Sequence, residues 1–155
     1  MVQATLLFLR DEDRILLAMK KRGFGVDKWN GVGGKIEANE TPSLAAIREC
    51  KEEIGVTPAF LTDAGTLTFT FPSDDASMNS EVRVFTCTHW NGDPHETEEM
   101  RPQWFTLQDI PYDNMWVDNR YWLPLVLNNK IVEGTFTFNE KEELVDHSVT
   151  EIHQM

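Results

Sequence analysis

Three glutamates of one short segment, Glu49, Glu52 and Glu53, have the spacing that brings side chains together on one side of an α-helix. Like charges on adjacent helical turns repel one another by about 0.2–0.5 kcal/mol per pair. A hard divalent cation removes this repulsion, since Mg2+ and Mn2+ take oxygen ligands and often bridge protein carboxylates to substrate phosphates. The three glutamates are therefore a candidate site for Mg2+, in which Mn2+ can substitute.

The residues around these glutamates favour the metal site over an ordinary solvated acidic face, which is the commoner explanation of three such glutamates alone. Glu40 precedes the predicted helix and Arg48 lies inside it, so an ion pair between them can tie the incoming loop to the helix. Gly33 and Gly34 leave the backbone bare, able to offer a carbonyl to a metal ion or amides to phosphate.

Local signals place the helix at about residues 42–53. Thr41 is a suitable N-cap, Pro42 suits the first helical position, and Gly55 stands where a left-handed residue would end the helix. Apolar residues on one arc are expected to face the core, with the glutamates on the other side: Leu44, Ala46, Ile47, Cys50 and Ile54.

The segment 34–56 resembles the Nudix box, a motif of the Nudix hydrolase family. The box has eight fixed positions, and all are filled here, by Gly34, Glu40, Arg48, Glu49, Glu52, Glu53, Gly55 and Val56. Cys50 departs from the pattern, because the family prefers a larger aliphatic residue there. The resemblance implies hydrolysis of a diphosphate linkage that depends on a divalent cation.

The resemblance also implies roles for single residues. Glu49, Glu52 and Glu53 would supply metal ligands and the general base, and the choice of base among them stays open. The Gly33 backbone would add a carbonyl, and Glu99 would complete the metal shell. Glu99 as a plain surface acid remains the alternative, because its neighbours in the acidic segment 95–99 have a similar composition.

The composition of the chain limits the kinds of partner that it can bind. The chain has 155 residues and a net charge of -12, which argues against a nucleic-acid polymer as partner because such proteins neutralise phosphates with Lys and Arg. The two cysteines, Cys50 and Cys87, fit reduced thiols better than a disulfide framework. No apolar segment approaches the length that crosses a bilayer. We expect a single domain over residues 1–155, monomeric and cytoplasmic, with no membrane partner.

Hydrophobic patterns predict a β-rich chain with two helices. We expect a hairpin of strands 4–9 and 14–19, further strands, a second helix at 117–128 that Pro124 can kink, and a C-terminal hairpin of 131–138 and 144–152. The further strands are expected at 59–63, 66–71, 81–88 and 103–106, with a polar connection at 73–80. Two helices flanking a mixed β-sheet give an α/β class, a Nudix-type α/β/α sandwich.

Several stretches outside the box resemble the oxidised purine nucleoside triphosphate hydrolases, the eukaryotic-type counterparts of MutT. They lie at residues 19–25, 29–31, 99–102, 104–105 and 115–122. The resemblance implies Mg2+-dependent hydrolysis of 8-oxo-dGTP and related damaged nucleotides to the monophosphate and pyrophosphate, a sanitation of the nucleotide pool. The alternatives are a Nudix pyrophosphatase of another substrate, such as O6-methyl-dGTP or a dinucleoside polyphosphate, and a non-catalytic nucleotide-binding module, against which the intact glutamates argue.

A substrate pocket carries over from this resemblance. Trp116 would stack on a purine and Phe24 would form a second apolar face, since planar bases favour aromatic walls. For Phe69 and its neighbour Phe71, plain core packing remains an equal alternative. The basic triplet 20–22 is either a solvated loop or a means of attracting a polyphosphate toward the glutamates, and its composition alone favours neither. The implied substrate-binding residues are Thr5, Lys20, Phe24, Asn30, Gly34, Lys35, Phe69, Phe71, Met100, Trp116, Asp118 and Asn119.

Asn119 stands where the resembled enzymes carry a second aspartate beside the one that matches Asp118. An amide NH2 of Asn119 can donate to O6 of guanine, while an ionised Asp118 accepts from N1 and N2. A 2-oxo-adenine edge would require a protonated Asp118, at about 4 kcal/mol for an ordinary aspartate near pH 7. The pair therefore predicts a preference for oxidised or O6-methylated guanine nucleotides over 2-oxo-dATP.

Overall fold

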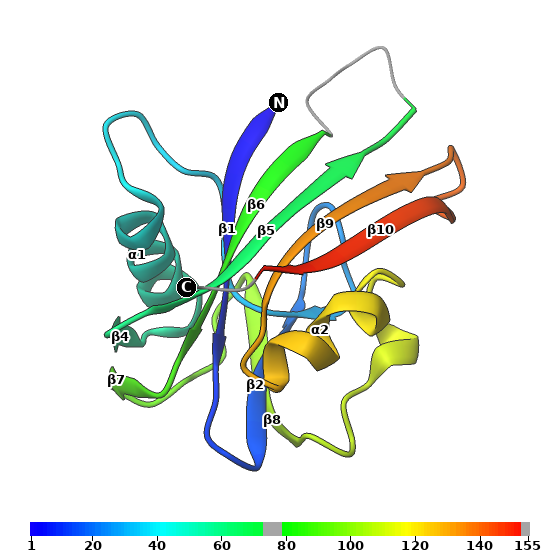
Figure 1. The fold of residues 1–155 in the computed structure, drawn as a ribbon. Helices are drawn as coiled ribbons and strands as arrows, with labels where there is room; N and C mark the ends of the chain where they lie inside the picture. The colour runs from blue at the N-terminus through cyan, green and yellow to red at the C-terminus, as the bar shows by residue number, and fades with distance from the viewer. Residues whose placement is uncertain (73–78, 153–155) are drawn as a thin grey trace.

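Three β-sheets and two α-helices form the part of the chain that the computed structural model describes, residues 1–72 and 79–152 (Figure 1). The first sheet holds, in spatial order, β1 (Val2–Leu9), β6 (Ser80–Cys87), β5 (Thr62–Thr70), β9 (Ile131–Phe138) and β10 (Leu144–Ile152). The second holds β3 (Trp29–Asn30), β2 (Arg14–Lys20) and β8 (Met100–Thr106), and the third β4 (Thr57–Ala59) and β7 (His89–Asn91). The helices are α1 (Pro42–Ile54) and α2 (Asn119–Leu127), with a short 3-10 helix at Tyr112–Asn114.

The first sheet is mixed, as predicted. β1 runs parallel to β6 and β5 runs parallel to β9, whereas β5 and β6 are antiparallel. The C-terminal hairpin of β9 and β10 is also confirmed. Most of the polar connection predicted at 73–80 lies outside the described residues. Within the described ranges no helix is long and apolar enough to cross a membrane.

Strands β1 and β2 do not form the predicted hairpin, and this expectation was wrong. β1 pairs with β6, β2 pairs with β3 and β8, and a single bridge joins Arg10 to Ile15. The charged turn is real, because Asp11 Oδ1 accepts from Asp13 N at 2.9 Å and from Arg14 N at 2.8 Å. The two strands nevertheless diverge after the turn into separate sheets, a pairing that local sequence does not specify.

The strand predicted at 59–63 was also wrong in its bounds. The structure divides this segment between β4 and β5, with Phe60 between them at φ 58°. A left-handed residue cannot continue a strand, so the backbone turns here. The strand predicted at 66–71 belongs to the longer β5.

Helix α1 forms where its end signals placed it. Thr41 Oγ1 accepts from Leu44 N at 3.2 Å, Pro42 opens the helix, and Gly55 ends it at φ 77°. Its buried face holds Ala46, Cys50 and Ile54, but Leu44 is 56% exposed, contrary to the prediction. At about 100° per residue Leu44 lies some 200° from Ala46, on the opposite side of the helix.

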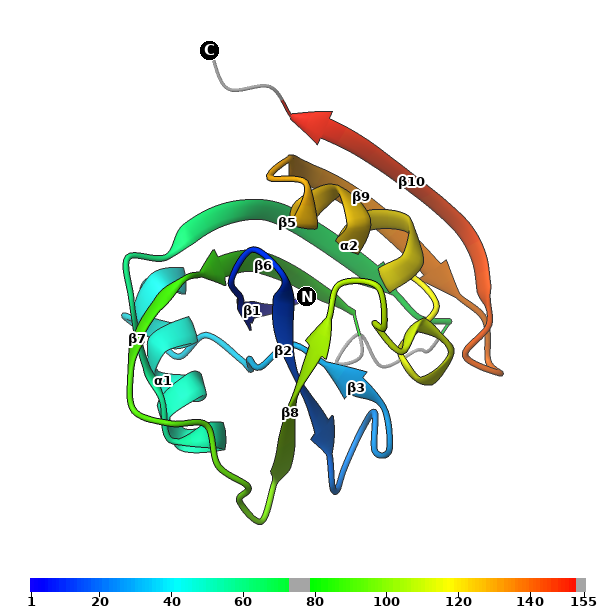
Figure 2. The same ribbon diagram turned by 90° about the horizontal axis from the view of Figure 1, so that it is seen from below.

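The two helices lie on either side of β1 and β2, as Figures 1 and 2 show. Alternate residues of β1 point to opposite faces: Leu7 and Leu9 pack in one core cluster with Cys50 and other residues of α1. Phe8 packs in a second cluster with Trp122 and other residues of α2. The α/β/α sandwich is therefore confirmed.

Candidate active site

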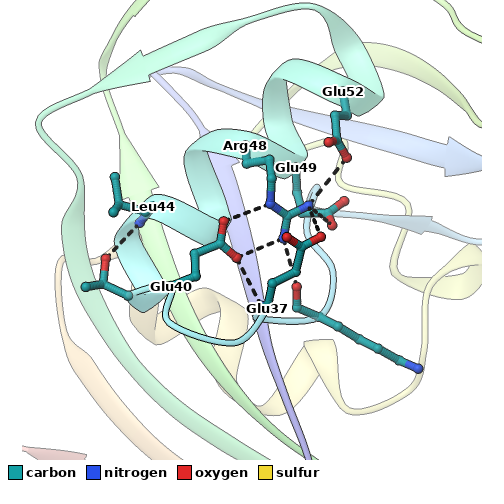
Figure 3. Close-up of polar contacts among 8 residues, drawn as sticks. Glu37, Glu40, Leu44, Arg48, Glu49 and Glu52 are labelled. Carbon is teal, nitrogen blue, oxygen red and sulfur yellow. Dashed lines mark hydrogen bonds and ion pairs between the residues drawn. The ribbon is translucent and has the colours of Figure 1, made fainter.

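Arg48 holds the loop before α1 against the helix (Figure 3). Its Nε donates to Glu40 Oε2 at 2.8 Å, and its Nη2 donates to Glu40 Oε1 at 3.0 Å and to Lys35 O at 3.0 Å. Its Nη1 donates to Glu49 Oε1 at 2.8 Å and lies 3.4 Å from Glu52 Oε2. The Arg48 guanidinium, with the Glu37 backbone N–H, lowers the pKa of Glu40 to about 2. The predicted pair of Glu40 and Arg48 is thus present, in a two-bond geometry.

Glu53 is the most buried acid of the helix, with only 6% exposure, although the sequence pattern assigned it to the solvent side. Its helical angle lies between those of Cys50 and Glu49, so it borders the apolar face rather than opposing it. Glu53 Oε2 accepts from Gly33 N at 3.2 Å. Burial raises the pKa of Glu53 to about 8, and repulsion from Glu49 and Glu99 adds to this rise. Burial also raises the pKa of Glu49, whereas the Glu52 side chain is exposed.

The two glycines before the box allow the backbone to run close to these acids. A Cβ at Gly34 would lie 2.6 Å from Cδ of Glu49, and a Cβ at Gly33 would lie 1.9 Å from the Thr5 carbonyl oxygen. A side chain at Gly33 would therefore clash with the backbone of β1, and one at Gly34 would displace the Glu49 carboxylate. The contact of Gly33 with Glu53 uses its N–H, and the role predicted for its carbonyl stays a prediction.

The segment His95–Glu99, which we call the acidic loop, brings Glu99 to the glutamates of α1. The charge of Glu99 contributes to the raised pKa of both Glu49 and Glu53. Glu99 also lies 3.5 Å from Arg22 Nη2, whereas Glu96 pairs with Lys21. Two residues of the basic triplet therefore fasten this loop, and only Lys20 lines the neighbouring cavity.

Carboxylates are the type of ligand that a hard divalent cation takes. In the part of the chain that the structure describes, no three His, Cys, Asp or Glu side chains converge as a ready metal cluster. Arg48 and Arg22 instead neutralise Glu49 and Glu99. The mutual repulsion around buried Glu53 is nevertheless what a bound cation would relieve, and every donor is an oxygen, as Mg2+ and Mn2+ prefer.

A cavity of about 290 Å³ opens beside these acids. Lys20, Gly33 and Gly34 line it on the side of the glutamates. Lys35 does not line it, and its carbonyl instead accepts from Arg48. The other predicted substrate-binding residues all contribute to the lining: Thr5, Lys20, Phe24, Asn30, Gly34, Phe69, Phe71, Met100, Trp116, Asp118 and Asn119.

Aromatic rings form one wall of the cavity. The Trp116 and Phe24 rings are tilted by 31° with centroids 5.1 Å apart. Phe71 stacks on Phe138 at 5.1 Å, and Phe69 stacks on Phe136 at 5.6 Å. Phe69 and Phe71 therefore satisfy both interpretations, because each packs against the core and also lines the cavity.

Two polar residues of the cavity lining have side-chain atoms without partners. Thr5 Oγ1 and Asn119 Oδ1 are buried without a hydrogen-bond partner among the described residues. Buried polar atoms are nearly always hydrogen-bonded, so these two point to a ligand. Asp118 Oδ2 accepts from Trp122 Nε1 at 2.8 Å.

The structure corrects the expected orientation of Asn119. Its NH2 donates to Trp116 O at 2.9 Å, so the buried Oδ1, an acceptor, is the atom left for a ligand. Asp118 is not an ordinary aspartate either, because burial raises its pKa to about 6. The preference derived from a donating amide and an unperturbed acid therefore loses its basis.

Several residues that line the cavity were not predicted from the sequence, among them Lys28, Trp122 and Phe138. Trp122 fixes Asp118, and its position four residues later on α2 was an available signal. Phe138 lines the cavity at the end of β9 and shares a face with Phe136, a period-2 pattern that was also visible.

Known proteins are similar to this chain in sequence and in fold. The NUDIX domain profile matches residues 1–126. The chain is 41% identical over 151 residues to an oxidized purine nucleoside triphosphate hydrolase of Danio rerio, covering 97% of this chain and 96% of the relative. It is 41% identical over 148 residues to the protein of the same name in Mus musculus, covering 96% and 94%. The crystal structure of a MutT protein from Bacillus halodurans has a TM-score of 0.84, with 23% identity over 96% of this chain and 97% of its own. With its box, its sandwich and these matches, the chain belongs to the Nudix family.

Proposed function

We propose that this protein hydrolyses oxidised purine nucleoside triphosphates such as 8-oxo-dGTP to the monophosphate and pyrophosphate, with Mg2+ as cofactor and Mn2+ as a substitute. Its role would be to keep damaged nucleotides out of the pool used for DNA synthesis. The names of the Danio rerio and Mus musculus relatives support this substrate class, because both align over nearly their full length. Cys50 and Cys87 are both free and buried, which supports a reducing, cytoplasmic location.

One observation carries the proposal: an aromatic cavity, lined by residues with buried polar atoms that lack partners, opens beside a cluster of carboxylates. A purine fills such a cavity, since its faces stack on aromatic rings and its edge supplies hydrogen bonds. The carboxylates then lie where a phosphate chain attached to that base would extend. A cluster of carboxylates beside a base pocket suits a nucleotide only with a cation present, because glutamates repel phosphates unless a cation lies between them.

The polar residues of the cavity lining suit a guanine edge. Asn119 Oδ1 and an ionised Asp118 are two neighbouring acceptors, and guanine presents two neighbouring donors at N1 and N2. The Thr5 hydroxyl is free to donate to O6. Trp116 would stack on the ring system, as its place in the lining allows.

Lys20 lines the cavity, its charge acts on Glu53, and it is suited to contact a phosphate. Glu49, Glu52, Glu53 and Glu99 would hold the cation, and one of these acids would accept the proton of the attacking water. Bound Mg2+ supplies neutralisation of the phosphate charge and a lowered pKa for that water. Arg48 orients Glu49 through their 2.8 Å hydrogen bond.

The test is hydrolysis by the purified protein with Mg2+, using dGTP, 8-oxo-dGTP, 2-oxo-dATP, O6-methyl-dGTP and a dinucleoside polyphosphate, with products separated by ion-exchange chromatography. We expect monophosphate and pyrophosphate, with a higher kcat/KM for 8-oxo-dGTP than for dGTP. Glu53→Gln is the matched control for contaminating phosphatases. Preference for the dinucleoside polyphosphate, or binding of nucleotide without hydrolysis, would overturn the proposal.

A further inference from the structure

The acidic loop closes the C-terminal end of α1. The last carbonyls of a helix have no partner within it and must be satisfied from outside. Here His95 N donates to Ile54 O at 3.1 Å, and Thr97 Oγ1 donates to Glu53 O at 2.8 Å. The loop is therefore attached to the backbone of the residue whose side chain is the buried acid of the site.

The Thr97 hydroxyl uses its full bonding capacity at this point. While donating to Glu53 O, it accepts from Glu99 N at 3.3 Å and from Met100 N at 3.2 Å. A hydroxyl has one donor and two acceptor positions, and all three are occupied. One atom thus connects the backbone of Glu53 to the backbone of Glu99.

Lys21 fixes the same loop from the end of β2. Its backbone N–H donates to Glu99 O at 2.9 Å, and its Nζ donates to Thr97 O at 2.8 Å. These contacts involve the backbone of the loop, and the Glu99 carboxylate, which pairs with Arg22, lies near enough for its charge to act on Glu49 and Glu53.

We propose that Thr97 is a positioning residue that sets the separation of Glu99 from Glu53, and thereby assembles the cation site from two distant segments. This inference rests on the proposed function, which makes both acids ligands. Thr97 does not line the cavity, and its hydroxyl is fully engaged with backbone groups. A loop cap of purely structural effect would lower stability when removed but would leave the affinity for the cation unchanged.

The experiment measures Mn2+ binding to nucleotide-free protein by isothermal titration calorimetry. Thr97→Val keeps the shape and loses the hydroxyl, and Thr97→Ser is the matched control that retains it. We expect Thr97→Val to weaken Mn2+ binding roughly 10-fold or more, as the loss of groups that orient metal ligands does, and Thr97→Ser to bind like the unmutated protein. Thr97→Val combined with Glu99→Gln should bind no more weakly than Glu99→Gln alone, because both act on one ligand.

Unchanged Mn2+ affinity in Thr97→Val, or additive losses in the double variant, would overturn the inference. If the unmutated protein bound no Mn2+, the proposed function itself would fail, so the two failures are distinct. If Thr97→Val did not fold, hydrogen exchange of the unmutated, metal-free protein would decide. The amides of Glu99 and Met100 should be protected, and exchange at the rate of an open loop would refute the role of the hydroxyl.

Discussion

The raised pKa of Asp118 predicts that substrate preference changes with pH. O6-methylation of guanine removes the N1 hydrogen, so N1 becomes an acceptor, and Asp118 must be protonated to meet it. An aspartate of ordinary pKa would require about 4 kcal/mol for this at pH 7. Because burial raises the pKa of Asp118 to about 6, the free energy needed to protonate it at pH 7 falls to about 1.4 kcal/mol, which corresponds to a factor of about 10 in population.

The quantity to measure is the ratio of kcat/KM for O6-methyl-dGTP to kcat/KM for 8-oxo-dGTP between pH 5.5 and 7.5. One substrate uses protonated Asp118 and the other uses the ionised form, so the ratio should rise about 10-fold for each unit that the pH falls. Titration of Glu53 and the other metal-site acids affects both substrates alike and cancels in the ratio.

Two variants isolate the cause. Asp118→Asn cannot titrate, so its ratio should not change with pH. Asn119→Asp places a second buried acid beside Asp118, and because close carboxylates share a proton, the ratio at pH 7 should rise in favour of O6-methyl-dGTP. A ratio independent of pH in the unmutated protein would refute the assignment of Asp118 to the base edge.

Three further predictions concern the helix. Glu53→Gln should lower kcat by 100-fold or more, as loss of a metal-site acid does. It should also stabilise the metal-free protein, because the pKa of Glu53 is about 8 when folded against 4.5 as its ordinary value, so the residue destabilises the fold increasingly as pH rises from 4.5 to 8. Urea denaturation should therefore show a larger gain in the free energy of unfolding at pH 8 than at pH 5. Arg48→Lys should destabilise the protein above pH 4.5 and progressively less as pH falls towards 2, because the lowered pKa of Glu40 means that the pair stabilises the fold only when the acid is ionised. A difference in Tm between the two proteins that persisted at pH 2 would contradict this. Cys50→Leu should cost about 1–3 kcal/mol in urea denaturation because Cys50 is fully buried, with kcat/KM nearly retained; a large kinetic loss would show that repacking reaches Glu49.

Local interactions explain what the sequence predicted well. Thr41, Pro42 and Gly55 define both ends of α1 through contacts within a few residues, so its bounds could be read directly. The Nudix box could be recognised for the same reason, because its residues lie on one helix and the loop before it. The partnership of Glu40 and Arg48 spans only eight residues.

Contacts between distant residues explain what the sequence did not predict. The charged turn at Asp11 looks like a hairpin turn, and only the parallel pairing of β1 with β6 separates β1 from β2. The hydroxyl of Thr97 reaches Glu53 across 44 residues. The amide of Asn119 turns its NH2 to the Trp116 carbonyl, so which atom remains for a ligand depended on a side-chain orientation that no spacing specifies.

The contact of Phe24 with Trp116 affects how nucleotide affinity should be understood. Their ring centroids are 5.1 Å apart, whereas a base between two rings needs about 7–8 Å, twice the usual contact distance of carbon atoms. A purine that takes the face of Trp116 now covered by Phe24 must therefore displace that ring, which Gly23 and Gly25 flank at φ 84° each. Binding on that face is an exchange of aromatic partners, so its free energy reflects the difference between two stacking interactions. A modified base would then gain affinity on this face only by the amount that it stacks better than phenylalanine, and most discrimination between bases would fall to the polar edge.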